Sequence, residues 1–438
     1  MNLVINGRLI TRDTEGKGYY EHGAVAYEGS KIVEVGEESA LRRKYPDAHC
    51  IDARGGVIMP ALINAHTHIY SALARGLSIV GNNPTNFYEV LDGTWWAIDR
   101  KLMMDGTRAS ATALYMDSIK QGVTTIFDHH ASYGEIPGTL HTIAEESKRL
   151  GLRSCLCYEV SDRDGEEKCL QAIQENADFI TECEKNKDPM LAAMFGGHAL
   201  FTISDKTFDR MVEANNGRTG YHIHVSEGMN DVYDSLQNYG RRPVQRLQDH
   251  GILGPKTILG HCIHVNTAEM EIIKETGTMV VNNPQSNQGN AVGCSPVLQM
   301  MAKGITVGMG TDAYTHDMLE SMKAFLTIQR QGKRMSRLIN DMLDYTRLEM
   351  RPDRYPKQNV DLSALTTSLC DDMALIRQQG IQLAADIQPE INIYGNPQLL
   401  SRLVTNLISN AYRYGKENGH ILVRLHSNDT DASERRSL

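Results

Sequence analysis

The chain has 438 residues, of which 41% are hydrophobic and 23% charged, a composition ordinary for a soluble globular protein of two or three domains. Its formal net charge is −9 and its isoelectric point about 6.0. The chain therefore lacks the overall excess of basic residues that would predict a nucleic-acid partner. No apolar stretch reaches the roughly 18–20 residues of a membrane span, and the N-terminus lacks the pattern of a signal peptide. The eight cysteines form no CxxC pair, which predicts reduced thiols and a cytoplasmic location.

The first 57 residues read as short strands separated by Gly-containing turns, as in "NLVINGRLI" and "GAVAYEGSKIVEVG". Alternation of apolar and polar residues between such turns is typical of a half-buried sheet. This part of the chain therefore predicts a small β-sheet unit.

Eight short apolar runs follow, and most are separated by amphipathic helical patterns such as "SATALYMDSIKQG". The runs occupy residues 57–66, 123–130, 153–160, 191–199, 220–227, 257–264, 278–285 and 305–312. Eight strand–helix units predict an α/β fold, a (β/α)8 TIM-like barrel over residues 58–328, with its active site at the C-terminal ends of the strands. The alternative is an open doubly wound sheet, but no Gly-rich phosphate loop follows the first strand to support it.

The pattern changes again at about residue 327. The stretch "IQRQGKRMSRLINDMLDYTRLEM" (328–350) predicts one amphipathic helix, and a linker with two prolines follows it. Beyond the linker we expect a helix, a pair of strands, a second helix and a last strand, at about 361–379, 381–388, 391–395, 396–413 and 420–425. We divide this part into a helix and linker (329–358), an incomplete α+β fragment (359–426) and a polar, disordered tail (427–438).

Polar residues stand at the ends of several predicted barrel strands. In "INAHTHIY" (63–70), His66 and His68 lie two residues apart and so point to the same side of a strand. Taken alone, such a pair is more often two ordinary core histidines than a metal site. Further polar residues end strands 4, 5, 6 and 8, namely His198, His222, His224, Glu227, His261, His264 and Asp312. Independent accidents rarely place so many histidines and carboxylates at one rim, so the joint pattern favours a site.

Imidazoles with one carboxylate form a ligand set suited to Zn²⁺ or another borderline divalent ion. Such an ion lowers the pKa of its water to about 7, and a nearby carboxylic acid then transfers protons to a leaving group. Glu227, three residues after His224, is placed for that role. For His129, His130 and His222 we expect satisfied polar contacts inside the barrel instead.

Residues 1–328 resemble the amidohydrolase superfamily, in its branch of mononuclear-metal deaminases and chlorohydrolases, and within it the SsnA-type aminohydrolases. The matching stretches are "MPALINAHTHIYSALARG", "LDGTWWAIDRKL", "IKQGVTTIFDHHAS", "HIHVSEG", "GHCIHV" and "GMGTDAYTHDMLESMK". The resemblance implies that the N-terminal strands form part of a β-sandwich. It implies one divalent metal, Zn²⁺ before Fe, and hydrolysis of a C–N bond at a ring or amidine-like carbon of a small molecule.

The resemblance also implies roles for individual residues. The metal ligands would be His66, His68, His224 and Asp312. Glu227 would transfer protons, His261 would orient the water or the substrate oxygen, and Asp312 would double as a general base. Substrate contacts are implied for His198, Trp95, Asn283 and Asn287. The two asparagines stand in "NNPQSN", where many relatives carry a histidine before the proline, and Trp95 with Trp96 would line the pocket or pack it closed.

Residues 329–426 resemble part of a sensor histidine kinase. "KRMSRLINDMLDYTRLE" is similar to the second helix of the dimerisation hairpin, and "NPQLLSRLVTNLISNAYRYG" is similar to the helix that holds the nucleotide in the ATPase domain. By this match Asn406 and Asn410 would be a remnant of a nucleotide site. The phospho-accepting histidine motif and the Gly-rich adenine box are both missing, so we expect no kinase activity.

Three hypotheses follow for the whole chain. The leading one is a cytoplasmic metal-dependent aminohydrolase with a non-catalytic C-terminal piece. The second is a signalling or dimerisation module with a nucleotide-binding remnant, in which the amphipathic helix pairs with a second copy to form a homodimer. The third is a non-functional chimera of two protein fragments.

Overall fold

The computed structural model describes the chain except for residues 15, 78, 333–355, 375–380, 417 and 428–438. Two compact units divide between Gln329 and Arg330, and each is described by itself. The predicted dimerisation helix falls largely, and the predicted disordered tail almost wholly, outside the described residues. None of the described helices combines the length and the apolar character needed to span a membrane.

The first unit begins with a five-stranded sheet in the order β3-β2-β1-β4, with β5 also paired to β1. Its elements are β1 (Asn2–Ile10), β2 (Tyr19–Glu28), β3 (Lys31–Glu37), α1 (Glu38–Lys44), β4 (His49–Asp52) and β5 (Val57–Ile58). Alternate residues of β1, such as Leu3 and Ile5, are buried together with Ala24 and Ala26 of β2 and Leu41 of α1. The predicted N-terminal sheet is therefore present, with its core on one face.

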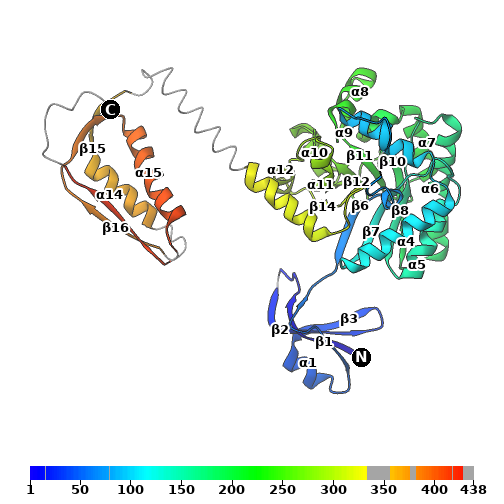
Figure 1. Cartoon of the computed structure of the whole chain (residues 1–438), viewed down its shortest axis with the longest axis horizontal. Coiled ribbons are helices and arrows are strands. Elements are labelled where there is room, and N and C mark those ends of the chain that lie inside the picture. Colours follow the sequence, from blue (N-terminus) through cyan, green and yellow to red (C-terminus); the bar gives the residue numbers. More distant parts are fainter. Residues whose placement is uncertain (15, 78, 333–355, 375–380, 417, 428–438) are drawn as a thin grey trace. The chain divides into compact units, whose positions relative to one another are not determined.

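The rest of this unit is a barrel of parallel strands with helices on the outside (Figure 1). Its strands are β6 (Leu62–Thr67), β7 (Val123–His130), β8 (Arg153–Tyr158), β9 (Leu191–Ala193), β10 (Phe195–Ala199), β11 (Tyr221–Val225), β12 (Ile258–His261), β13 (Met279–Asn282) and β14 (Val307–Met309). The predicted fourth strand is split at Met194, so that β9 pairs with β8 while β10 pairs with β11. Bridges between Thr67 and Asp312 and between Val160 and Gly197 join the two parallel sheets. The predicted α/β barrel is confirmed.

Helices alternate with these strands and bury apolar faces against them. They are α4 (Met104–Lys120), α5 (Thr139–Leu150), α6 (Glu166–Asn186), α7 (Asp205–Asn215), α8 (Met229–Tyr239), α9 (Pro243–Asp249), α10 (Thr267–Glu275), α11 (Pro284–Gly289) and α12 (Val297–Ala302), with residues 318–332 also helical. Between β6 and α4 the chain forms short turns, η1 (Ile69–Ser71), α2 (Phe87–Val90), η2 (Leu91–Trp95) and α3 (Trp96–Asp99). The η2 turn is a π-helix, a form that often marks functional sites.

The second unit is a small α+β structure. It contains β15 (Gln358–Asp361), α14 (Leu362–Ala374), β16 (Gln382–Ile387), β17 (Asn392–Gly395), α15 (Pro397–Tyr414) and β18 (His420–Leu425). The two strands expected to form a pair, β16 and β17, lie in different sheets: β17 is antiparallel to β15, and β16 is parallel to β18. That part of the prediction is wrong, because α15 carries the chain back so that β18 takes the place beside β16. A core of Cys370, Ile381, Ile408, Tyr412 and Ile421 holds this unit together.

Candidate metal and catalytic site

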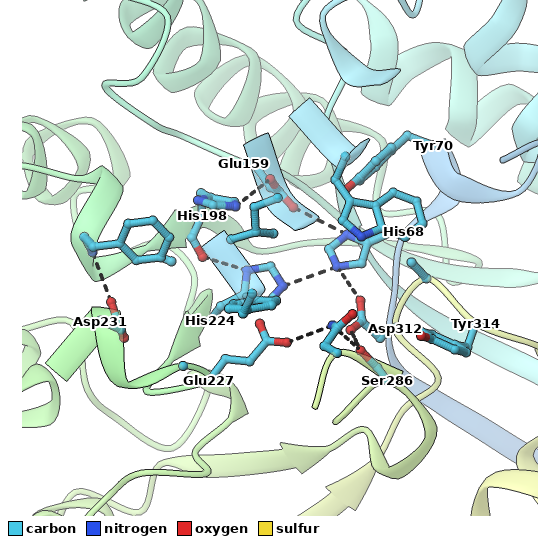
Figure 2. A pocket seen from close by; sticks show the side chains of 18 residues that line it. His68, Tyr70, Glu159, His198, His224, Glu227, Asp231, Ser286, Asp312 and Tyr314 are labelled. Atoms are coloured by element: carbon cyan, nitrogen blue, oxygen red, sulfur yellow. Dashed lines mark hydrogen bonds and ion pairs between the residues drawn. The ribbon is translucent and has the colours of Figure 1, made fainter. Parts of the chain in front are cut away.

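The C-terminal ends of the barrel strands bring the expected metal ligands together. His66 and His68, at the end of β6, are 0% and 4% exposed. The Nε2 atom of His68 lies 2.9 Å from Asp312 Oδ1 and 3.2 Å from His224 Nε2 (Figure 2). His66 Nε2 lies 3.9 Å from Asp312 Oδ1. Ligand atoms of His66, His68 and Asp312 lie within 4.8 Å of one another, and so do those of His66, His224 and His261.

Hydrogen bonds to the Nδ1 atoms orient the three histidines. His68 Nδ1 donates to the His129 carbonyl at 2.6 Å, and His224 Nδ1 donates to the His198 carbonyl at 2.7 Å. His66 Nδ1 shares a hydrogen bond of 2.8 Å with His222 Nε2. A histidine whose Nδ1 is occupied in this way presents its Nε2 lone pair, which is the usual arrangement behind a metal ligand.

The Nε2 atom of His66 is buried and has no hydrogen-bond partner among the described residues. An unpaired buried polar atom costs free energy unless something satisfies it. Here it faces a carboxylate and other imidazole nitrogens, a donor set that suits a borderline divalent cation. The residues present therefore fit a metal ion of the zinc type.

Several residues around these ligands have left-handed backbone angles that non-glycine residues rarely adopt. Asp312 has φ 56°, His261 φ 64° and Ser226 φ 50°. The Asp312 amide donates to the His66 carbonyl at 3.0 Å, and Ser286 hydroxyl donates to Asp312 Oδ2. Strained residues of this kind cluster at functional sites, where the surrounding structure fixes them.

Glu227 and His261 lie beside the ligand cluster. Glu227 Oε2 is 3.5 Å from His261 Nε2, and Asn290 Nδ2 donates to Glu227 Oε1 at 3.3 Å. Burial raises the pKa of Glu227 to about 7; the His261 side chain opposes this and the Asp312 carboxylate adds to it. A carboxyl group with such a pKa can hold or release a proton near neutral pH.

Asn283 and Asn287, expected near the substrate, lie against His261. Asn287 Oδ1 accepts from His261 Nδ1 at 2.8 Å, and Asn283 Nδ2 is 3.4 Å from His261 Nε2. The structure thus places both amides where they orient this histidine. Their direct contact with a substrate stays a prediction.

A pocket opens onto these groups, and it is lined by both aromatic and polar side chains. Of the residues expected to contact substrate, His198 and Trp95 line it. His198 Nδ1 is 2.8 Å from Thr202 Oγ1, and burial lowers the pKa of His198 to about 3 although Glu159 acts against it. Trp96 is 4% exposed and packs with its ring centre 5.8 Å from that of His198.

The three histidines expected to make ordinary contacts have different surroundings. His222 is bonded to His66, and His129 Nδ1 contacts Glu159 Oε1 at 2.9 Å. For His130 the prediction is wrong, since neither of its ring nitrogens has a hydrogen-bond partner among the described residues. His130 points to the other face of β7 from His129, between Tyr70 and Tyr158, and burial lowers its pKa to about 3.

Several residues of the pocket were not singled out from the sequence. They include Tyr70, Phe87, Glu159, Phe201, Asp231, Ser286, Asn290 and Tyr314. Glu159 was the most accessible to prediction, because it directly follows β8 as other site residues end their strands. Phe87 belongs to the segment of short turns between β6 and α4. No periodic pattern in that part of the sequence predicts which of its side chains face the pocket.

Asn406 and Asn410 lie one turn apart on α15, and both are exposed. A nucleotide site there stays a prediction.

A parallel barrel with histidines and carboxylates at its strand ends is an arrangement suited to metal-assisted hydrolysis. The chain matches the Amidohydrolase family over residues 57–353, and residues 23–48 match the bacterial imidazolonepropionase-like composite domain. The chain belongs to the amidohydrolase family. It is a hydrolase of carbon–nitrogen bonds other than peptide bonds, as the sequence predicts.

Known relatives are similar over most of this chain. The 5'-deoxyadenosine deaminase of Methanosarcina barkeri is 30% identical over 326 residues, which are 73% of this chain and 72% of that protein. The 5-methylthioadenosine/S-adenosylhomocysteine deaminase of Thermoanaerobacter pseudethanolicus is 30% identical over 316 residues, or 71% and 69% of the two chains. The crystal structure of a zinc-containing adenosine deaminase from Xanthomonas campestris has a TM-score of 0.64 at 21% identity, covering 76% of this chain and 74% of that one.

Proposed function

We propose that this protein is a zinc-dependent deaminase that releases ammonia from an amino group on a nitrogen heterocycle. The observation that carries the proposal is the convergence of His66, His68, His224 and Asp312, with the Nδ1 atoms of the histidines occupied elsewhere. Those four residues would hold the ion. Bound there, Zn²⁺ supplies Lewis acidity and lowers the pKa of water to about 7, and Fe is the alternative metal.

The protein's own groups supply the proton transfers. Protonated Glu227 donates to the departing nitrogen, which turns a poor leaving group into ammonia. The Asp312 carboxylate accepts the proton that the attacking water loses, and its hydrogen bond from Ser286 keeps Oδ2 oriented. In this proposal His261, held by Asn287 at 2.8 Å, stabilises the oxygen that develops negative charge.

Aromatic groups support a planar ring as substrate. Phe87, Trp95 and Phe201 line the pocket together with His198. Faces of this type bury a heterocycle while a few polar groups orient it. The deaminases of adenine nucleosides to which this chain is similar make a purine of that kind the first choice.

The remaining parts of the proposal concern the cell and the C-terminal unit. All eight cysteines are free, with Cys50 and Cys294 exposed, which supports a reducing cytoplasmic location. We assign no catalytic role to the C-terminal unit, in which Asn406 and Asn410 are exposed on α15. Its pairing in a homodimer is part of the same proposal.

The proposal is tested by a substrate screen with ammonia as the readout. Zinc-loaded protein would be incubated with 5'-deoxyadenosine, S-adenosylhomocysteine, adenosine and guanine, next to His224→Ala and the control His141→Ala. His141 is an exposed residue of α5, and its ring pairs with Glu145 and Glu182. Ammonia from at least one purine, lost in His224→Ala and kept in His141→Ala, is the expected result. Turnover by His224→Ala equal to wild type would refute the assignment.

A further inference from the structure

A buried carboxylate, Glu159, lies between the candidate metal site and the substrate pocket (Figure 2). It follows β8 and is 2% exposed. Its backbone is fixed on both sides, because its amide donates to the His130 carbonyl at 2.8 Å and its carbonyl accepts from Tyr133 hydroxyl at 2.7 Å. A carboxylate this deeply buried requires cationic or hydrogen-bonding partners.

The main partner of Glu159 is His129, whose two ring nitrogens both face acceptors. Nε2 lies 3.0 Å from the Gly197 carbonyl and 2.9 Å from the His222 carbonyl, and Nδ1 lies 2.9 Å from Glu159 Oε1. Carbonyl oxygens only accept, so Nε2 donates to them. His129 therefore ties Glu159, which follows β8, to β10 and β11.

The same residues lie directly behind a proposed ligand. The backbone carbonyl of His129 accepts from the Nδ1 atom of His68 at 2.6 Å. Ligand atoms of His68, His129, Glu159 and His224 lie within 4.8 Å of one another. A displacement of the Glu159 side chain is therefore expected to reach His68 through His129.

The two oxygens of Glu159 face two further histidines. Oε1, which also forms the hydrogen bond with His129, is 3.4 Å from the Nδ1 atom of His68. Oε2 is 3.9 Å from Nε2 of His198, the histidine that faces the substrate pocket. Negative charge behind a ligand histidine raises its basicity, and loss of such partners weakens metal binding about 10–100-fold.

We infer that Glu159, held by its hydrogen bond with His129, is a positioning residue that sets the zinc affinity of His68. This inference rests on the proposed function. It assigns a specific task to a residue outside the four proposed ligands and the proposed proton-transfer groups.

The test compares Glu159→Gln with Glu175→Gln in the full-length protein. Glu175 is also a buried carboxylate, 6% exposed, but it accepts from the backbone amides of Gly138 and Leu140, in the helical layer outside the barrel strands. The measurements are the zinc dissociation constant by chelator competition, the visible spectrum of the Co²⁺-loaded protein and the melting temperature. We expect zinc binding weakened about 10–100-fold with an altered Co²⁺ spectrum for Glu159→Gln, and neither change for Glu175→Gln.

The outcomes separate this inference from the proposed function. Zinc affinity of Glu159→Gln within twofold of wild type, with an unchanged Co²⁺ spectrum, overturns the inference and leaves the deaminase proposal standing. Wild-type protein that binds no zinc overturns both. If Glu159→Gln does not fold, His129→Gln replaces it, because it removes the imidazole that holds Glu159 while an amide can still donate to the two carbonyls; zinc affinity equal to wild type in that variant also overturns the inference.

Discussion

Arg246 of α9 is the basis of our main stability prediction. Its side chain is 2% exposed, and its guanidinium donates to Asp205 Oδ1 at 2.6 Å and to the carbonyls of Leu200 and Ile203 at 2.8 and 2.6 Å. It also stacks over Tyr239, 3.5 Å from the ring centre. These bonds hold the turn that follows His198, so Arg246 links helix packing to the pocket.

We expect Arg246→Met to lower the free energy of unfolding of the barrel unit by about 3–5 kcal/mol, because it leaves buried carbonyl groups without their hydrogen-bond donor. Two buried carbonyls lose their donors, at about 1–3 kcal/mol each, while the aliphatic chain of methionine retains part of the packing. The half-exposed Asp205 regains water and adds little.

Urea unfolding followed by tryptophan fluorescence measures this change. The chain has two tryptophans, Trp95 and Trp96, and both lie in the segment beside the pocket, so the signal reports on the barrel unit. The matched control is Arg241→Met, whose exposed pair with Asp249 is worth at most about 1 kcal/mol. A loss below about 1 kcal/mol for Arg246→Met would refute the reasoning.

Three further predictions concern catalysis, pH and backbone packing. Glu227→Gln should lower kcat about 10²–10⁴-fold with zinc content unchanged, as measured by ammonia release and metal analysis; full activity would contradict its role. Ion pairs with Arg149 and Arg108 lower the pKa of Glu146 to about 2. The stabilisation that ionised Glu146 gives is therefore complete above pH 4.5 and is lost as the pH falls towards 2. Glu146→Gln should lower the free energy of unfolding at pH 7 by about 1–2 kcal/mol, a modest value because both arginines are half exposed. The same variant should lose less stability than wild type between pH 4.5 and pH 2. In Gly310→Ala the new Cβ would lie 2.6 Å from the His66 carbonyl oxygen, so the backbone of this ligand must shift. Chelator competition should then show zinc binding weakened more than tenfold. Gly36 has open space around it, so the control Gly36→Ala should bind zinc as wild type does.

The barrel was predictable because its signals are local and repeated. Each strand is a short apolar run, and the two-residue period places His66 and His68 on one side whatever the rest of the chain does. Asp312 and His224 join them because parallel strands in a barrel end at the same rim. To place these residues together one needs only the number of strands and their order, and the eight apolar runs along the chain supply both.

Side-chain partners were less predictable, because they depend on distant residues. Asn283 and Asn287 stand in a strand-end loop that suggests substrate contact, but whether an amide faces the pocket or His261 depends on the geometry of two strands. Glu159 has no motif of its own, and its importance appears only when the bonds of His129 are counted. The pairing of β16 with β18 likewise requires knowledge of how α15 returns the chain.

The central claim is that His66, His68, His224 and Asp312 form one catalytic zinc site. Its most direct test is zinc titration of metal-free protein, with bound zinc and ammonia release from 5'-deoxyadenosine measured in the same samples, for wild type and Asp312→Asn. The account predicts that wild-type activity rises in proportion to bound zinc and saturates at one ion per chain, while Asp312→Asn gains neither. Activity in metal-free protein, or one tightly bound zinc per chain in Asp312→Asn with wild-type turnover, would contradict it.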